Sequence, residues 1–252
     1  MNSAIIMKEM IDNNQSCRVI KEGDDILVKL RPMSVLEGLK GKLSNEDIEY
    51  CNNIMNKQIA VNTLKTNLYG RCINTSCTNQ NQSVFRAVPT GNIDSKVMLV
   101  NKQPTQYDVC NMSTHCNKED MFLSLILSKI NVSINSVYCT DMVKCNGSIN
   151  EQSCKDCVKN YLEKEINFIK PHIIICNGLC VLNAFAGMNI VNGLPESLSY
   201  GIIYDATTLL GRSIKITAIY DLNRVLQKQG SDYVNCKGKL WKQITQAFDA
   251  IK

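Results

Sequence analysis

Cysteine is the residue type in this chain that most directly suggests chemistry. The 252 residues include thirteen cysteines, and four of these stand out by position: Cys72, Cys77, Cys145 and Cys157. Two pairs of thiolates from separate segments are a common way to hold an iron-sulfur cluster, and four thiolates also hold zinc. Cys154 could take the place of Cys157. Spacing alone leaves equally open that these are ordinary reduced cysteines.

Polar residues that directly follow short apolar runs form a second group with chemical potential. The apolar runs are residues 97–101, 136–140, 172–176 and 214–220. The segments that follow them are Asn101 to Pro104, Thr140 to Cys145, Cys176 to Gly178, and Tyr220 to Asn223. Ligands of open parallel sheets bind at the carboxyl ends of the strands. We therefore expect the functional site at these four segments.

Strands that alternate with helices are the elements that must position these residues. The four apolar runs read as strands, and helical patterns cover residues 118–130, 150–169 and 178–186 between them. A closing helix is expected at 238–251, and the turn-rich segment 188–212 suggests a short hairpin. This order predicts an α/β domain with a parallel sheet.

Residues 1–69 differ in pattern and are predicted to be an N-terminal extension, with the main domain at 70–252. A hairpin is expected over 17–30 with its turn at 23–25, followed by a polar helix over 45–68. Neither element carries a motif, so the role of the extension is unknown.

Composition excludes several classes of protein. The chain is 44% hydrophobic and 20% charged, which excludes a disordered or collagenous chain. No apolar run is long enough to span a bilayer and no signal peptide is evident, so we expect a cytoplasmic protein without membrane contact. The net charge of +5 is only weak support for nucleic-acid binding. No Walker or G-x-G-x-x-G motif is present, so no nucleotide cofactor is expected.

Five segments, taken in order, resemble the uracil-DNA glycosylase superfamily, specifically its iron-sulfur branch (family 4 and the phage-type relatives). Val137 to Cys145 is the most specific match, being similar to the family's V-Y-I-T-N-V-V-K-C. The others are Cys72 and Cys77 with 83–85, then 97–108, then Cys157 to Pro171, then Ala218 to Leu226. The resemblance implies a three-layer α/β/α fold with a central, mostly parallel four-stranded sheet.

The resemblance also implies a 4Fe-4S cluster, held by Cys72, Cys77, Cys145 and Cys157, with zinc as the less favoured metal. The first two cysteines are separated by four residues here and by two in the family. The expected role of the cluster is structural, as an anchor for loops beside DNA.

The chain departs from the family at the positions that hold the base. The family's uracil-reading asparagine falls on Asp141, its last-motif histidine on Asp221, and its stacking phenylalanine on His115. An ionised Asp141 can only accept hydrogen bonds, which suits the amino group of a cytosine-type base better than the O4 of uracil. The alternative is that Asp141 caps a helix or pairs with Lys144.

The first-loop motif is also altered. The family's glycine and glutamate fall on Asn101 and Lys102, whereas the acidic residue that ends the loop is kept as Asp108. Asp108 is predicted to act as general base or oxocarbenium stabiliser, with Asn101 or Gln103 sharing that task. The alternative is a loop carboxylate bound to backbone amides.

Three further residues are candidates for contacts to the leaving base or to DNA. Lys102, Asn223 and Arg224 could replace the family histidine electrostatically. Lys102 and Arg224 are also expected to contact DNA, and Asn223 with Asp221 is expected to line the base site.

These features together predict a monomeric DNA glycosylase. It would hydrolyse the N-glycosidic bond of a flipped, modified base, of cytosine or uracil type, in repair or in conflict between phage and host. The rival hypothesis is a catalytically inactive DNA-binding or processivity module with the same fold, and a third is a zinc-bound binding domain.

Overall fold

The computed structural model describes residues 18–22, 25–29, 45–69, 77, 86–111, 114, 118–147 and 150–252. The chain divides into two compact units, Met1–Ala60 and Val61–Lys252. The first unit contains an antiparallel hairpin of β1 (Arg18–Glu22) and β2 (Asp25–Lys29), as the sequence predicts. Helix α3 (Asn45–Tyr69) begins in this unit and ends in the second.

The second unit is built on a six-stranded sheet, with the strand order β4-β3-β5-β8-β7-β6. The four predicted strands are its parallel part: β3 (Val97–Asn101), β4 (Tyr138–Asp141), β5 (Ile173–Asn177) and β8 (Ser213–Ile219). Two further strands, β6 (Val191–Asn192) and β7 (Ile203–Thr208), extend the sheet antiparallel beyond β8. The predicted α/β fold class is confirmed, but the prediction of four strands was two short, because the expected hairpin joins the main sheet.

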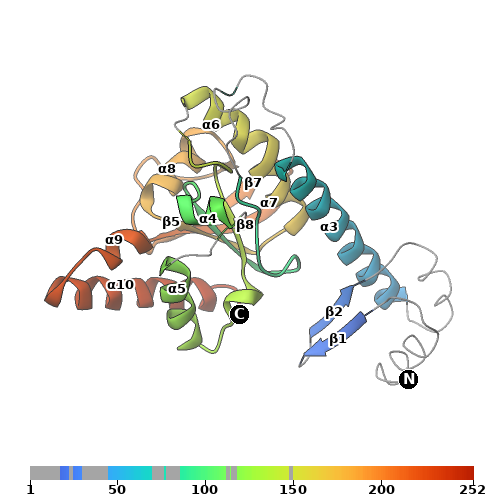
Figure 1. Ribbon diagram of the computed structural model, residues 1–252, viewed down its shortest axis with the longest axis horizontal. Helices are drawn as coiled ribbons and strands as arrows, with labels where there is room; N and C mark the ends of the chain where they lie inside the picture. Colours follow the sequence, from blue (N-terminus) through green and yellow to red (C-terminus); the bar gives the residue numbers. More distant parts are fainter. Residues whose placement is uncertain are drawn as a thin grey trace. The chain divides into compact units, whose positions relative to one another are not determined.

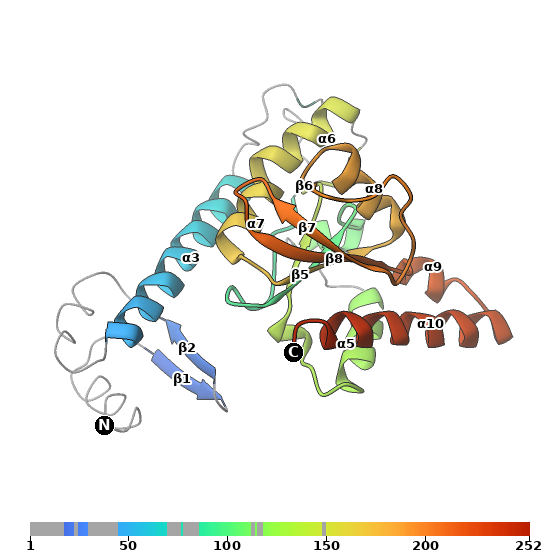
Figure 2. The same ribbon diagram turned by 180° about the vertical axis from the view of Figure 1, so that it is seen from behind.

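Helices cover both faces of this sheet, which makes the three predicted layers (Figures 1 and 2). One face carries α5 (Lys118–Ser128), α9 (Leu222–Leu226) and α10 (Gly230–Asp249). The other face carries α8 (Leu179–Gly187) and the run of α6 (Glu151–Cys157), η2 (Val158–Leu162) and α7 (Glu163–Ile169). A short 3-10 turn, η1 (Ile134–Ser136), precedes β4.

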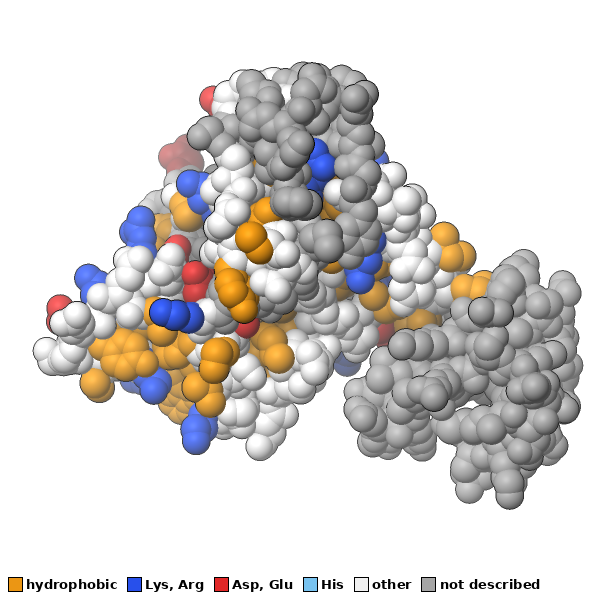
Figure 3. Space-filling view, viewed as in Figure 1, with side chains coloured by type: hydrophobic (Ala, Val, Ile, Leu, Met, Phe, Trp, Pro, Cys, Tyr) orange, Lys and Arg blue, Asp and Glu red, His pale blue; other side chains and the backbone are white. Residues whose placement is uncertain are grey.

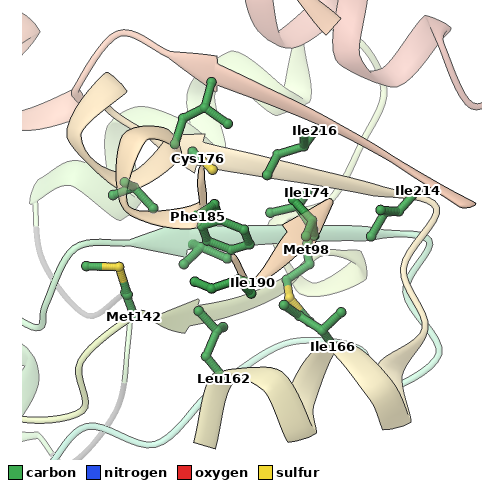
Figure 4. Packing of buried hydrophobic residues seen from close by; sticks show 14 of the residues in the cluster. Met98, Met142, Leu162, Ile166, Ile174, Cys176, Phe185, Ile190, Ile214 and Ile216 are labelled. Atoms are coloured by element: carbon green, nitrogen blue, oxygen red, sulfur yellow. The ribbon is translucent and has the colours of Figure 1, made fainter. Parts of the chain in front are cut away.

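Alternating apolar residues in each strand feed the two cores. In β3, Met98 and Val100 face one core whereas Val97 and Leu99 face the other. Figure 4 shows the first core, where Leu162 and Ile166 point from the helix towards the strands and Phe185 lies at the centre. Burial of both strand faces explains why these runs are almost continuously apolar.

Some large hydrophobic side chains remain exposed over α5 and α10, where Figure 3 shows them gathered on the surface. They are Met121, Leu125, Val234 and Trp241. α10 also begins eight residues earlier than the predicted 238–251 helix, because Gly238 lies inside the helix instead of starting it.

Candidate active site

The carboxyl ends of the four parallel strands meet at one edge of the sheet and form a row of polar side chains. Asp141 at the end of β4 pairs in register with Asn101 at the end of β3. Asn101 Oδ1 accepts a hydrogen bond from Asn177 Nδ2 of β5 at 2.9 Å. Asp221 follows β8, next to β5. The row Asp141, Asn101, Asn177 and Asp221 is therefore the candidate active site.

Asn177 links the strands of this row, a role that sequence reasoning missed. Besides donating to Asn101, it accepts a hydrogen bond from the backbone N–H of Leu222 through Oδ1, at 2.9 Å. Its side chain is thus fixed between β3 and the start of α9. The sequence feature that could have indicated this role is an asparagine at the end of an apolar strand, directly before Gly178.

Gly178 is required where the chain leaves β5. Its φ of +99° lies in the region that disfavours side chains, and a Cβ there would lie 3.4 Å from Asp221 Oδ2. That distance is an ordinary contact, so it is the backbone conformation that requires glycine here.

Asp221 is the N-cap of α9. Its Oδ1 accepts a hydrogen bond from the backbone N–H of Arg224 at 2.9 Å, and the residue is half-buried. Asn223 and Arg224 are exposed on this short helix. The structure therefore brings Asp221 to the row, with Asn223 and Arg224 on the adjoining surface.

Asp108 belongs to a short helix that the sequence did not predict. α4 (Gln106–Cys110) forms where a loop was expected, with Thr105 as its N-cap. Asp108 Oδ2 accepts hydrogen bonds from the Thr105 backbone N–H at 2.9 Å and from its hydroxyl at 2.6 Å. This capping box explains why a loop this short folds into a helix. It also agrees with the alternative that Asp108 is a carboxylate bound to backbone amides. The catalytic role of Asp108 stays a prediction.

Asp141 is completely buried, and its carboxylate is oriented by Thr114. The Thr114 hydroxyl donates to Asp141 Oδ2 at 2.7 Å. Thr114 is itself fixed, because its backbone N–H donates to Val88 O at 2.8 Å and its carbonyl accepts from Thr90 Oγ1 at 3.2 Å. His115, the predicted stacking residue, lies outside the described residues.

A buried network of charged and polar side chains contacts the backbone of Asp141. The Lys144 ammonium forms an ion pair with Glu165 of α7. It also donates to Thr140 Oγ1 at 2.5 Å and to the backbone carbonyl of Asp141 at 2.8 Å. The partner of Lys144 in this network is Glu165, whereas the sequence had suggested the Asp141 side chain.

Tyr138 completes the network from β4. Its hydroxyl donates to Glu165 Oε2 at 3.1 Å. Burial, together with the negative charge of Glu165, raises the pKa of Tyr138 well above its ordinary value. Tyr138 is therefore held as a neutral donor to the carboxylate.

The structure describes three of the four predicted metal-binding cysteines. Cys145 and Cys157 are buried in one cluster, which Cys154 contacts from its edge. Cys77 is half-buried, and Cys72 lies outside the described residues. Within the described part of the chain, no group of three or more Cys, His, Asp or Glu side chains is placed to hold a metal ion. Because one of the four cysteines falls outside that part, the cluster stays a prediction.

A groove of about 490 Å³ adjoins the row. Its wall includes the residues that directly follow Asn101 and Asp141, namely Lys102, Gln103, Met142 and Val143. The remaining lining residues are Asn146, Gly147, Asn150, Glu151, Cys154 and Met188. Burial raises the pKa of the Cys154 thiol, and nearby Lys102 opposes this only in part. Two of the predicted site residues, Lys102 and Gln103, therefore line this groove.

Three-layer α/β/α proteins with a largely parallel sheet bind their ligands at the carboxyl edge of that sheet, which is where the polar row lies. The family model of the uracil DNA glycosylase superfamily matches residues 88–245, which include the whole row and more than half of the chain. The chain therefore belongs to the uracil DNA glycosylase superfamily.

Membership of this family indicates the general function of the protein. The family is one of DNA glycosylase-type hydrolases of DNA repair, so membership indicates DNA as the partner of this protein. Among the helices that the structure describes, none combines the length and apolar composition needed to cross a membrane.

Proposed function

We propose that this protein excises a flipped base that carries an exocyclic amino group, leaving an abasic site in DNA. The observation that carries the proposal is the setting of Asp141, a carboxylate at the base-reading position of the family. Thr114 donates to its Oδ2, so this oxygen already acts as an acceptor in the folded protein, and an ionised Asp141 offers Oδ1 as a second acceptor. An acceptor suits the amino group of a cytosine-type base and opposes the O4 of uracil.

The burial of Asp141 adds a condition to this proposal. The side chain has no exposed surface in the free protein. A base can therefore reach the carboxylate only if the site opens when DNA binds. Glycosylases read a base after taking it out of the stack into a snug pocket, so a site that closes over the base is consistent with this chemistry.

The groove beside the row supports a substituted base as substrate. Its volume of about 490 Å³ lies within the range of about 300 to 1,000 Å³ that holds drug-sized molecules. Such a groove leaves room for a substituent beyond a plain pyrimidine ring. Its wall includes the amide side chain of Gln103, which can both donate to and accept from a polar substituent on the ring, and that of Asn146, whose Nδ2 also donates to Gln106.

Bond cleavage is assigned to residues at the β3 end of the row. Asp108 orients a water molecule or stabilises the oxocarbenium ion, and Asn101 or Gln103 shares that task. Lys102 and Arg224 are exposed cations beside the row, where they favour the developing negative charge of the leaving base and contact phosphates. Asp221 and Asn223 line the base site, and His115 stacks on the base.

A 4Fe-4S cluster held by Cys72, Cys77, Cys145 and Cys157 is part of this proposal. Two observations support it: Cys145 and Cys157 share one buried cluster, and the backbone of Arg86, nine residues after Cys77, bridges to Cys145. Soft thiolates are the ligands that iron-sulfur clusters prefer. The protein purified without oxygen should be brown and contain iron, and Cys145→Ser should lose both. A colourless, zinc-containing protein would favour the zinc alternative.

The test of function is an incubation with oligonucleotides that each carry one modified base. The panel is uracil, 5-hydroxymethyluracil, 5-hydroxymethylcytosine and glucosylated 5-hydroxymethylcytosine, followed by hot alkali to break the strand at abasic sites. Cleavage at a cytosine-type base is expected. Asp141→Asn should shift the preference towards uracil, whereas the exposed control Asp205→Asn should not. An unchanged preference in Asp141→Asn would remove the assigned role of this residue.

The inactive DNA-binding module remains the second candidate, and one observation favours it. Asp221 occupies the position of the family histidine and uses its carboxylate to cap α9. Binding of DNA without cleavage of any oligonucleotide in the panel would establish that alternative.

We also propose that the protein acts as a monomer, since the whole row comes from one chain. Light scattering at micromolar concentration measures this directly. A dimer would contradict it and would direct attention to the exposed side chains on α5 and α10.

A further inference from the structure

The buried network under Asp141 connects a helix on one face of the sheet to the base-reading segment. The Lys144 ammonium forms an ion pair with Glu165 and donates hydrogen bonds to Thr140 Oγ1 and to the backbone carbonyl of Asp141. Tyr138, Thr140, Lys144 and Glu165 are at most 2% exposed. The ion pair is thus removed from water.

Stability by itself does not account for such a network. Taking two charges out of water is so unfavourable that well-packed apolar residues of similar volume often give equal or greater stability. What apolar residues cannot do is hold a backbone carbonyl by a directed hydrogen bond. The Lys144 ammonium does this for Asp141, at 2.8 Å.

The helical run that supplies Glu165 contains an irregular turn just before this residue. The π-helical turn η2 (Val158–Leu162) separates α6 from α7, and such turns occur frequently at functional sites. Glu165 follows it, is completely buried, and faces Tyr138 and Lys144.

The segment from Asp141 to Cys145 is held on its other side by backbone contacts. Met142 N–H donates to Asn101 O at 2.8 Å and Val143 N–H donates to Lys102 O at 3.1 Å. These bonds fix the segment to the first loop. The Lys144 ammonium also holds the backbone carbonyl of Asp141 by a hydrogen bond.

We propose that Glu165 is a positioning residue, which acts through Lys144 to fix the backbone of Asp141 for base recognition. The inference rests on the proposed role of Asp141. Glu165 holds the ammonium, the ammonium holds the Asp141 carbonyl, and the carboxylate of Asp141 is thereby aimed at the base.

The test compares the single variants Lys144→Met and Glu165→Leu with the double variant that carries both. Each single variant leaves a buried charge without its partner and should melt at a lower temperature than the wild type. The double variant lacks both charges of the pair and should recover most of the thermal stability. If the pair only stabilises the fold, the double variant should also recover activity.

Positioning predicts a different result. In the double variant, single-turnover excision of the preferred base should be slower by about 10- to 100-fold, because small displacements at a reacting site have effects of this size. Backbone amides in 141–145 should exchange with solvent about tenfold faster, which reports local opening. Wild-type excision and wild-type exchange in a stable double variant would overturn the proposal.

The matched control is the exposed ion pair of Lys215 and Asp205, whose charged atoms are 2.8 Å apart. Lys215→Met with Asp205→Leu makes the same change of charge away from the row and should leave excision and exchange in 141–145 unchanged. If the double variant of the buried pair does not fold, Glu165→Gln replaces it. It keeps an acceptor for Lys144 and should show a smaller change in the same direction, and no change would count against the proposal.

Failure of the proposed function can be told apart from failure of this inference. If the wild type excises no base, the proposed function fails, and the exchange of residues 141–145 still decides whether Glu165 and Lys144 fix the segment.

Discussion

Two aspartates, Asp141 and Asp221, lie at the carboxyl edge of the sheet, and their surroundings differ. Asp141 is completely buried, with Thr114 on its carboxylate and the Lys144 ammonium on its backbone carbonyl. Asp221 is half-buried and caps a five-residue helix through a bond only three residues along the chain. The carboxylate of Asp141 is therefore held by a residue 27 positions away, whereas that of Asp221 is held by its own helix.

The largest effect is expected where the buried network loses one charge. Glu165→Leu leaves the Lys144 ammonium in the interior without its counter-ion, which should lower the free energy of unfolding by about 3 to 5 kcal/mol. Urea denaturation followed by circular dichroism measures this. A loss below about 1 kcal/mol, the range of exposed pairs, would mean that the network is open to water.

A smaller loss is expected when Asp141 loses its hydroxyl donor. Thr114→Val keeps the shape of the side chain and removes a hydrogen bond to a charged group, worth about 1.5 to 3 kcal/mol. The base preference should also weaken, because the carboxylate is no longer oriented. Thr114→Ser keeps the hydroxyl and is the control, so equal losses in both variants would show that the hydrogen bond is not responsible.

The network should also make stability depend on alkaline pH. The pKa of Tyr138 is raised in the folded protein by burial first and by Glu165 second. Above pH about 10 the unfolded chain loses this proton while the folded chain keeps it, so stability falls as the pH rises. The slope from one group is at most about 1.4 kcal/mol per pH unit. Denaturation at several alkaline pH values should show a shallower fall in Tyr138→Phe than in the wild type, and parallel curves would contradict the prediction.

The smallest effect belongs to Asp221. Asp221→Ala removes the N-cap of α9 and should lower the free energy of unfolding by about 1 kcal/mol. Asp221→Ser, another good N-cap, should restore it. A loss as large as that of Glu165→Leu would remove the contrast between the two aspartates, since it would show that Asp221 also depends on the wider structure.

Local patterns in the sequence were sufficient for the main elements. The alternation of apolar strands with amphipathic helices predicted β3, β4, β5 and β8 and the helices between them, because both sheet faces must be covered. The order of the family motifs also predicted which residues would reach the carboxyl edge. Asn101 and Asp141 are there because each ends a strand, and Asp221 because it lies two residues after the end of β8.

Tertiary contacts decided the rest. Thr114 and Asp141 are 27 residues apart along the chain, and nothing near either residue announces their hydrogen bond. The same holds for Asn177 and Asn101, which are 76 residues apart. Sequence placed Asp141 and Asp221 at equivalent strand ends, but only the packing of distant segments buried one and left the other at the surface. Strand position follows from local periodicity, whereas the environment of a side chain depends on every segment that folds against it.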